Sequence, residues 1–580
     1  MNHRGHIIVF ATVCLLAGSC LFEARDNRSP VAAVQSIAPT PIPPSGSDGD
    51  VVQRAGGKKD PGQIFDRTAY VTLMQSYCLR CHGENGQGGL SSITDVEIMI
   101  ERKLLVPGDA EKSTLLARIK DLSMPTGSEK VSREEAVLFE GWIKDGMPGA
   151  VAALLPLVDP TGNESFVSAD VKKLRDDGIS PDSMRYLILA QSMGETGGKT
   201  FADGLASLRA FLNSLSWKPS LAPISTVSKD LGIVRINLDD FGLTAANWDQ
   251  MAALYPYKQG IGRGINVPAS PAPPTAPGGL ILRADWLVRQ ASKPVHYHAL
   301  LQLPATLPAL ETLVGIKFAD QFLASLAGDR QLWAAGFLLS GVSEYNRVVY
   351  RSATPAGAFW KSSDFASNNG VKNIFTHPVG PKALVTSGFE EDGGEMIFSL
   401  PNGLQAYFLA NAAGTRLDVA PTNIVFDKER SQAVENGYSC MGCHGGGIIP
   451  KNDQILAAIG NSDTRLPLIY SSVATMQSKM KEDNERYGAA VRSCGSNPAL
   501  GRKTMLLLAD DFDKDIAFNR LSLELGLRPE QLRKAIPALG DRFRSTMILL
   551  EAKVIKLKRS DLEAVFNDLA LEIFAILGVG

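Results

Sequence analysis

The sequence predicts a multidomain protein with an all-α domain, a central α+β domain and a mainly α C-terminal region. Three observations predict this arrangement. The chain has 580 residues with 44% apolar content, which is more than one hydrophobic core usually holds. Apolar residues recur at helical spacing over residues 65–150 and again over 431–580. Between them, over 151–430, segments with helical spacing alternate with short apolar or alternating runs typical of strands.

The first part of the chain, residues 1–20, resembles an export signal. Basic Arg4 precedes an apolar run from Ile7 to Leu16, and the small residues AGS stand directly before Cys20. In one interpretation this is a bacterial lipobox and Cys20 becomes the lipidated N-terminus. In the other it is a plain secretory signal that is cleaved near the same place. Both predict export, and the first predicts a lipid-anchored protein of the bacterial cell envelope, in the periplasm or at the outer membrane.

Residues 21–64 are predicted to be a flexible linker. They are rich in Pro, Ser, Gly and Ala, with PTPIPPSGSDGD near their centre, and contain too few apolar residues to form a core. A helical pattern begins at Ile64 and leads into the first cysteine motif. The segment therefore has the composition expected of a tether between a membrane anchor and a folded body.

Charge argues against a nucleic-acid partner. The 59 Lys and Arg residues are balanced by 61 Asp and Glu residues, which gives a net charge of -2 and no overall basic field. The segment LELGLRPEQLRKAI has the rhythm of a helix-turn-helix, but it has no basic face and lies in a chain predicted to be exported. We interpret it as ordinary helix packing.

Four of the seven cysteines fall into two CxxCH motifs, CLRCH and CMGCH. Two cysteines three apart at a helix start can bond to the two vinyl groups of one haem, and the adjacent histidine then reaches the iron. The alternatives are a redox CxxC pair, half a zinc site or a disulfide, but a zinc site needs another close Cys/His pair and a redox pair does not need the histidine. Two such motifs in an exported chain predict two c-type haems. Their predicted attachment sites are Cys78, Cys81, Cys440 and Cys443, with His82 and His444 as iron ligands.

The residues after the first motif carry a family resemblance. The stretch VPGDAEKSTLLARIKDLSMPTGSEKVSREEAVLFEGWIKDGMPG predicts a helix over Glu111–Leu122, a loop with Met124, and a helix over Arg133–Asp145 that begins with a capping box formed by Ser132 and Glu135. The haem motif, the VPGD-E-S stretch, the MP loop and the W-I-x-x-G helix make residues 65–150 resemble the planctomycete-type cytochrome c domain. The whole chain resembles exported bacterial dihaem c-type cytochromes that carry this domain.

This resemblance implies that Met124 is the sixth iron ligand of the first haem. A thioether from a loop opposite the histidine raises the reduction potential and closes the iron to other ligands. The alternative is that Met124 fills a gap in the core. Met147 also precedes a proline, but it follows the last helix of the domain.

In the central region, SPDSMRYLILAQSM and TFADGLASLRAFLNSLSW are predicted helices, and GIVRINLDD, GGEMIFSLPN and LQAYFLAN are predicted strands. His296 and His298 are two apart, so in a strand they would point to one side, either as ordinary strand histidines or as haem ligands. The region resembles a poorly characterised part of exported bacterial haem proteins, and the resemblance implies no substrate.

The sequence offers several candidates for the sixth ligand of the second haem. We predict His377, in NIFTHPVGP, because few histidines lie outside the signal and the haem motifs. Met476 and Met480, four apart on a predicted helix, are the next candidates. His296, His298 or an open iron are the remaining possibilities. Two C-terminal segments, DRFRSTMILLEAKVIKLKR and DLEAVFNDLALEIFAIL, are predicted helices that enclose this haem, and Cys494 is either a packed thiol or an intermolecular partner.

These patterns favour electron transfer between the two haems and redox partner proteins. The alternative is a haem enzyme of peroxidase-like type, in which one iron stays open and the other haem supplies electrons. A third possibility is a ligand-binding haem sensor. Carbon monoxide or cyanide binding would distinguish an open iron from a closed one.

Overall fold

The computed structural model describes residues 65–82, 93–126, 130–147, 160–189, 201–228, 232–257, 281–428 and 432–578, apart from Asp66 and Asp95. The predicted signal sequence, the lipidation site Cys20 and the linker lie outside these residues. Within the described ranges, no helix combines the length and the apolar content needed to span a membrane.

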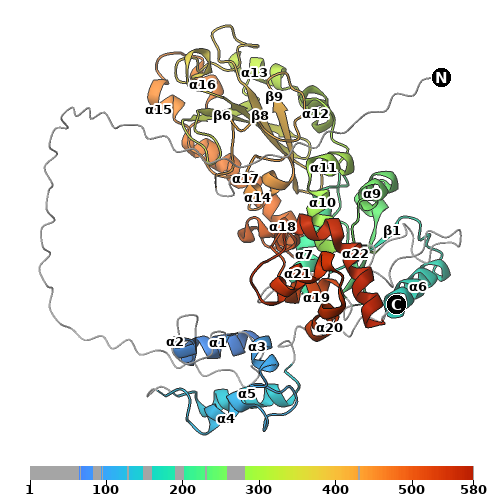
Figure 1. Ribbon diagram of the computed structural model, residues 1–580. Helices are drawn as coiled ribbons and strands as arrows, with labels where there is room; N and C mark the ends of the chain where they lie inside the picture. The colour runs from blue at the N-terminus through green and yellow to red at the C-terminus, as the bar shows by residue number, and fades with distance from the viewer. Residues whose placement is uncertain are drawn as a thin grey trace, which may run out of the picture. The chain divides into compact units, whose positions relative to one another are not determined.

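The described residues between 65 and 147 contain helices and no strand, as predicted, and Figure 1 colours these helices blue to cyan. The capping box at Ser132 is present, because Ser132 Oγ accepts a hydrogen bond from the Glu135 amide and the Glu135 carboxylate accepts one from the Ser132 amide. Tyr70, Phe139 and Trp142 pack together in the core. The helices are α1 (Arg67–Tyr77), α2 (Leu79–His82), α3 (Val96–Glu101), α4 (Thr114–Lys120) and α5 (Arg133–Lys144).

The first sheet has four strands in the order β2-β3-β1-β4, with β1 antiparallel to β3 and parallel to β4. Strand β1 lies inside SPDSMRYLILAQSM, so the predicted helix there is wrong. All five β1 residues are buried, and a short apolar run buried on both faces has no period that separates strand from helix. The predicted strand in GIVRINLDD is confirmed as β3. The strands are β1 (Met184–Ile188), β2 (Ser225–Ser228), β3 (Ile233–Asn237) and β4 (Ile281–Arg283).

Among the described residues, eight helices lie between residues 160 and 326, and two of them test predictions from the sequence. The predicted helix in TFADGLASLRAFLNSLSW is α7, whereas His296 and His298 lie on helix α11, so their prediction as strand residues is wrong. Pro294 at the first position of α11 favours a helix start there. The helices are α6 (Pro160–Asp176), α7 (Phe201–Asn213), α8 (Leu238–Phe241), α9 (Ala245–Ala252), α10 (Ala284–Ala291), α11 (Pro294–Leu300), α12 (Leu307–Val314) and α13 (Phe318–Leu326).

The second sheet is an antiparallel meander of five strands in chain order, and it confirms the strands predicted in GGEMIFSLPN and LQAYFLAN. Trp333 is opposite Arg351, Arg351 opposite Trp360, Trp360 opposite Ile397, and Ile397 opposite Tyr407. Residues directly opposite each other share a face, so these five side chains form one row across the sheet. The strands are β5 (Leu332–Phe337), β6 (Arg347–Thr354), β7 (Gly357–Asp364), β8 (Gly393–Ser399) and β9 (Gln405–Asn411).

The C-terminal part is helical, as predicted, and its helices cover both faces of the second sheet (Figure 1). Helices α15 and α16 pack with α13 against the face that carries Tyr350. Helices α14 and α17 cover the opposite face, because His444 packs on Tyr407 and Asp483 bonds to Trp360. The helices are α14 (Tyr438–His444), α15 (Ile455–Ile459), α16 (Leu466–Ile469), α17 (Val473–Ser493), α18 (Lys503–Phe512), α19 (Phe518–Glu524), α20 (Pro529–Ala535), α21 (Asp541–Glu551) and α22 (Arg559–Leu577).

One hydrophobic core runs from Leu187 to Phe574 and takes residues from both sides of position 430. The structure thus confirms the mixed α+β character of the chain after the N-terminal helices. Cys494, at the end of α17, is buried in this core, and burial raises the pKa of its thiol to about 11. Cys494 is therefore a packed thiol, which was one of the two alternatives predicted from the sequence.

Candidate functional site

The first CxxCH motif spans the junction of α1 and α2. The backbone stays helical there, since the Cys78 amide donates to the Met74 carbonyl at 2.9 Å and the His82 amide donates to the Cys78 carbonyl at 3.0 Å. Cys78 is buried, and burial followed by the neighbouring Cys81 raises the pKa of its thiol to about 11. His82 is half-buried and its Nδ1 has no hydrogen-bond partner among the described residues. The motif therefore presents two thiols and an available imidazole nitrogen on one short helical segment.

Met124 and Met147 differ in their surroundings. Met124 lies in the loop that follows the last α4 residue, Lys120. Two residues after the helix, Leu122 has a left-handed backbone conformation with φ of 61°. Met124 is 38% exposed and is not among the buried core residues of this domain. Met147 is 1% exposed and belongs to the core of this domain. Of the two methionines, Met124 is therefore the more exposed.

The second CxxCH motif forms most of α14. Tyr438, at the start of this helix, donates a hydrogen bond from its hydroxyl to Asp513 Oδ2 at 2.7 Å, and the guanidinium groups of Arg289 and Arg502 lie over its ring at 4.0 and 4.5 Å. These contacts hold α14 against α10 and the residues around α18. Cys440 is almost fully buried, whereas Cys443 is half-buried. No disulfide joins any of the described cysteines.

His444 is oriented by the loop that follows it. Its Nδ1 lies 3.3 Å from the Gly447 carbonyl oxygen, and since a carbonyl only accepts hydrogen bonds, Nδ1 carries the proton. Gly447 has φ of +108°, and a Cβ there would lie 2.3 Å from Asn484 Oδ1, so only glycine fits. Asn484 also holds this loop through both backbone groups of Ile448. Histidine metal ligands are commonly fixed in this way, which leaves Nε2 for the metal.

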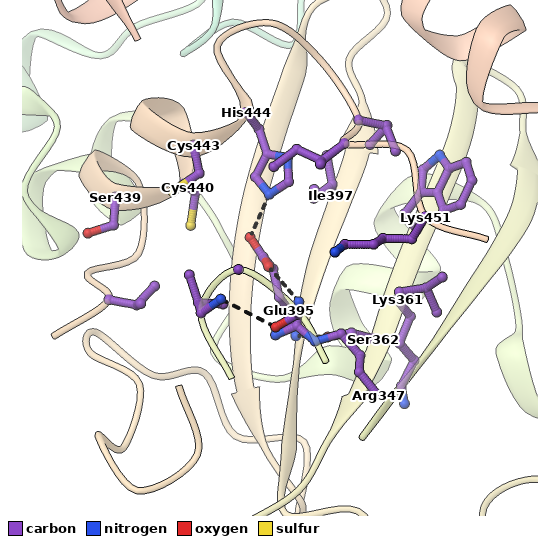
Figure 2. Close-up of a pocket in the computed structure, with 18 of the residues that line it drawn as sticks. Arg347, Lys361, Ser362, Glu395, Ile397, Ser439, Cys440, Cys443, His444 and Lys451 are labelled. Atoms are coloured by element: carbon purple, nitrogen blue, oxygen red, sulfur yellow. Dashed lines mark hydrogen bonds and ion pairs between the residues drawn. The ribbon is translucent and has the colours of Figure 1, made fainter. Parts of the chain in front are cut away.

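Nε2 of His444 faces a cavity of about 320 Å³ between α14 and the second sheet (Figure 2). This volume is within the range of small-molecule and cofactor pockets. Both cysteines and the histidine of the motif line it, together with strands β5 to β8, the segment after α14, and α17. Its apolar walls include Phe337, Val349, Trp360, Ile397, Ile448 and Met480, and its charged residues are Arg347, Lys361, Glu395, Asp427 and Lys451.

A buried carboxylate from the second sheet contacts the imidazole of His444. Oε1 of Glu395, on β8, is 3.5 Å from His444 Nε2, and its Oε2 is 3.8 Å from Nη1 of Arg347. Arg347 is held in turn by Asp364, with 2.5 Å between Nε and Oδ1. Burial by itself raises the pKa of a carboxyl, but His444 and Arg347 together hold the pKa of Glu395 below its ordinary value. The carboxylate is thus ionised and paired.

Comparison with known proteins concerns the first motif. Residues 78–126 match the family model described as Planctomycete cytochrome C. The chain contains a cytochrome c-type domain. No curated protein and no solved structure matches the chain.

The cytochrome c-type domain implies covalently bound c-type haem, and the residues at both motifs fit this group. In the cytochrome c-type domain, the fit rests on the paired thiols and the available nitrogen of His82. At the second motif, which lies outside the matched residues, it rests on the oriented imidazole and the adjoining cavity. In the described ranges, no group of three or more His, Cys, Asp or Glu side chains is arranged to hold a metal ion directly.

The predicted sixth ligands of the second motif lie in different places. Met480 lines the cavity, whereas Met476 and His377 are not among its lining residues. His377 is half-buried in a loop, with its Nδ1 3.0 Å from the Thr376 hydroxyl. His298 lies against Asn436, 2.7 Å from Nε2 to Nδ2, and burial and then Arg416 lower its pKa to about 4. His296 is half-buried on the same helix.

Sequence reasoning missed Glu395 and Arg347 and misplaced part of the cavity wall. The C-terminal helices α21 and α22 were expected to enclose the second haem, but their residues are not among those lining the cavity. The wall is formed by the sheet instead. One signal was present, since Glu395 shares a strand face with Ile397 and is followed directly by the apolar run MIF. An acidic residue on the buried face of a strand is uncommon unless it is paired.

Proposed function

We propose that this protein is an exported dihaem c-type cytochrome that transfers electrons. The observation that carries the proposal is the second CxxCH motif, whose cysteines and histidine line a cofactor-sized cavity although the motif lies outside the matched residues 78–126. Cys78, Cys81, Cys440 and Cys443 would bind the two porphyrins, and His82 and His444 would bind the irons. Each haem supplies a one-electron redox centre when bound.

The first haem site fits a role in electron transfer rather than in catalysis. Met124 is available in the loop after α4 and is not used in the core, which supports its assignment as the sixth ligand. A histidine and a methionine would close this iron to outside ligands and raise its potential. Electrons would then pass to redox partner proteins through the haem edge.

The N-terminal sequence supports a place in the cell envelope. Its apolar run and the AGS-Cys20 sequence fit a lipoprotein signal, and the Pro-rich linker would let the anchored protein reach its partners. We place the protein in the periplasm or at the outer membrane, held by lipid on Cys20, with no nucleic-acid partner.

One observation favours a second candidate, a haem enzyme with an open iron at the second site. Glu395 and Arg347 form a charged pair facing His444, where a protein built only for transfer needs no polar groups. Such a pair could bind and polarise a small ligand, while the first haem supplies electrons.

Haem counting tests the proposal. The full chain is produced in a host that attaches c-type haem, and intact mass and haem-to-protein ratio are measured for the wild type, for Cys78→Ala with Cys81→Ala, and for Cys440→Ala with Cys443→Ala. We expect two porphyrins in the wild type and one in each double variant. If the wild type carries one porphyrin and Cys440→Ala with Cys443→Ala still carries it, the protein is a monohaem cytochrome and the proposal is wrong.

A further inference from the structure

We infer that Lys451 binds a propionate carboxylate of the second haem, and so fixes which edge of the porphyrin faces the mouth of the cavity. This inference rests on the proposed function, because it requires haem at Cys440 and Cys443. It deepens that function by assigning a carboxylate-binding residue to a cavity in which the motif itself accounts for the vinyl groups and the iron alone.

A haem has two chemically different edges. Its two vinyl groups lie along one edge of the ring and its two propionates along the opposite edge, with the iron at the centre. The vinyl edge can be buried among apolar side chains, whereas each propionate carries a negative charge that must meet water or a cation. A complete site therefore has cysteines at one end, the histidine in the middle and a cation at the other end.

The residues of the cavity are arranged in this order. Figure 2 shows Cys440 and Cys443 on one side of His444 and Lys451 on the other. Lys451 belongs to the segment between α14 and α15, so it is positioned by the same stretch of chain that carries the motif. A porphyrin held by the cysteines and the histidine would have its propionate edge on the Lys451 side.

The two ends of the cavity differ in exposure. Cys440 is 1% exposed and belongs to the main hydrophobic core. Lys451 is half-buried, and its neighbours Ile449 and Asn452 are exposed. The cysteine end is thus the interior and the lysine end is the mouth. A carboxylate at the mouth can keep part of its hydration while it pairs with the lysine.

The cations that line the cavity differ in how they are paired. Arg347 Nε lies 2.5 Å from Asp364 Oδ1, and Lys361 Nζ lies 2.8 Å from Glu391 Oε2. Lys451 has no carboxylate partner in the part of the chain that the structure describes. Of these three cations, Lys451 is therefore the one whose charge is left for an anionic ligand.

An alternative is that Lys451 serves only to cover Phe337. Its Nζ lies 5.9 Å from the centroid of that ring, which is at the outer limit for a cation–π interaction. A lysine can lay its methylene groups along an apolar wall and still present its ammonium to a charged partner. The contact with Phe337 therefore orients the side chain and leaves the ammonium group available.

Glu395 has its own partners. Its Oε1 contacts His444 Nε2 at 3.5 Å, and its Oε2 lies 3.8 Å from Arg347 Nη1. Iron binding at Nε2 requires the first contact to be given up, whereas the contact with Arg347 can remain. Glu395 then stays paired with the sheet, and Lys451 is left for the porphyrin.

Zero-length cross-linking tests the inference in the full-length dihaem protein. A water-soluble carbodiimide joins an amine to a carboxylate that touches it; a C–N amide bond forms, and the water that leaves is taken up by the carbodiimide as a urea. We expect an amide between Lys451 and a propionate, identified by mass spectrometry of the peptide that carries haem on Cys440 and Cys443. Lys451→Arg should abolish this cross-link, because a guanidinium group does not form the amide.

The reduction potential gives a second readout. A positive charge beside the porphyrin favours the reduced haem, so Lys451→Gln should lower the potential of the second haem and leave that of the first unchanged. Lys451→Arg keeps the charge and should retain the wild-type potential. Lys479→Gln is the matched control, because Lys479 on α17 pairs with Glu482 at 3.1 Å and does not line the cavity. It should change neither the cross-link nor the potential.

Two results would overturn the inference. One is an amide that joins Lys451 to a protein carboxyl such as Glu395 in place of a propionate. The other is a Lys451→Gln variant whose second haem keeps the wild-type potential. Absence of porphyrin at Cys440 and Cys443 in the intact mass would instead overturn the proposed function.

Discussion

The indole Nε1–H of Trp360 donates a hydrogen bond to Asp483 Oδ2 over 2.9 Å. Trp360 is part of the cavity wall on β7, and Asp483 lies on α17, so the bond ties the sheet to the helix that covers it. Asp483 also accepts two hydrogen bonds from Arg351, at 3.0 and 3.2 Å. All three side chains are buried, and the shape of the cavity depends on this contact.

Removing Asp483 should therefore destabilise the protein strongly. Asp483→Ala leaves the Arg351 guanidinium and the Trp360 N–H buried without their shared acceptor, and breaking a buried pair in this way costs about 3–5 kcal/mol. Urea unfolding followed by circular dichroism measures the change. Glu485→Gln, exposed on the same helix, is the control and should change the free energy of unfolding by less than about 0.5 kcal/mol. Equal effects of the two variants would show that the bond contributes nothing.

Met124 is predicted to hold the first iron. Met124→Leu should open this haem, so that the reduced protein binds carbon monoxide at the cytochrome c-type domain and the His/Met signature disappears from its spectra. Met147→Leu is the matched control, because this buried methionine belongs to the core and such swaps usually cost less than about 1.5 kcal/mol. If the Met147 variant, rather than the Met124 variant, lost the signature, the ligand assignment would be wrong.

Local sequence patterns predicted many of the helices and strands correctly. The elements that were mispredicted are ones whose structure depends on pairing between distant segments. The Ser132 capping box and the strands around Glu395 and Tyr407 follow from spacing along a few residues, and the structure confirms them. Strand β1 and helix α11 were mispredicted because short apolar segments, or histidines two apart, fit either type of element. Only the pairing of distant segments decides between them.

Only part of the candidate site could be predicted from the sequence. The two CxxCH motifs are local and could be identified from the sequence. Arg347 and Glu395 reach His444 only because β6 and β8 sit in one sheet that faces α14, and nothing near the motif in sequence indicates this.

A buried charge cluster predicts the acid sensitivity of the C-terminal half. Glu524 is fully buried and lies 2.6 to 2.8 Å from nitrogens of Arg559, Arg520 and Arg283. Burial opposes its charge, but the guanidinium groups outweigh burial and hold its pKa well below the ordinary value. A carboxyl with a lowered pKa stabilises the fold above its unfolded pKa, about 4.3, and this stabilisation is lost as the pH falls below it.

Glu524→Gln should thus be destabilised by about 3–5 kcal/mol at neutral pH, since the arginines lose their counter-charge. The loss of stability between about pH 5 and pH 3 should also be less steep than in the wild type. Thermal unfolding across this pH range measures both effects, with exposed Glu530→Gln as the control. A variant with the wild-type pH profile would place the acid sensitivity elsewhere.

The tight turn after the second motif gives a test of how His444 is oriented. In Gly447→Ala, a Cβ would lie 2.3 Å from Asn484 Oδ1 on a backbone with φ of +108°, so the carbonyl must move away from His444 Nδ1. Losing this hydrogen bond makes the imidazole a weaker donor to iron, and the reduction potential of the second haem should rise while that of the first is unchanged. Gly446→Ala is the matched control, because a Cβ there comes no closer than 3.4 Å to the Pro498 carbonyl oxygen. Redox titration resolves the two haems, and an equal shift in both variants would mean that the Gly447 carbonyl does not orient the ligand.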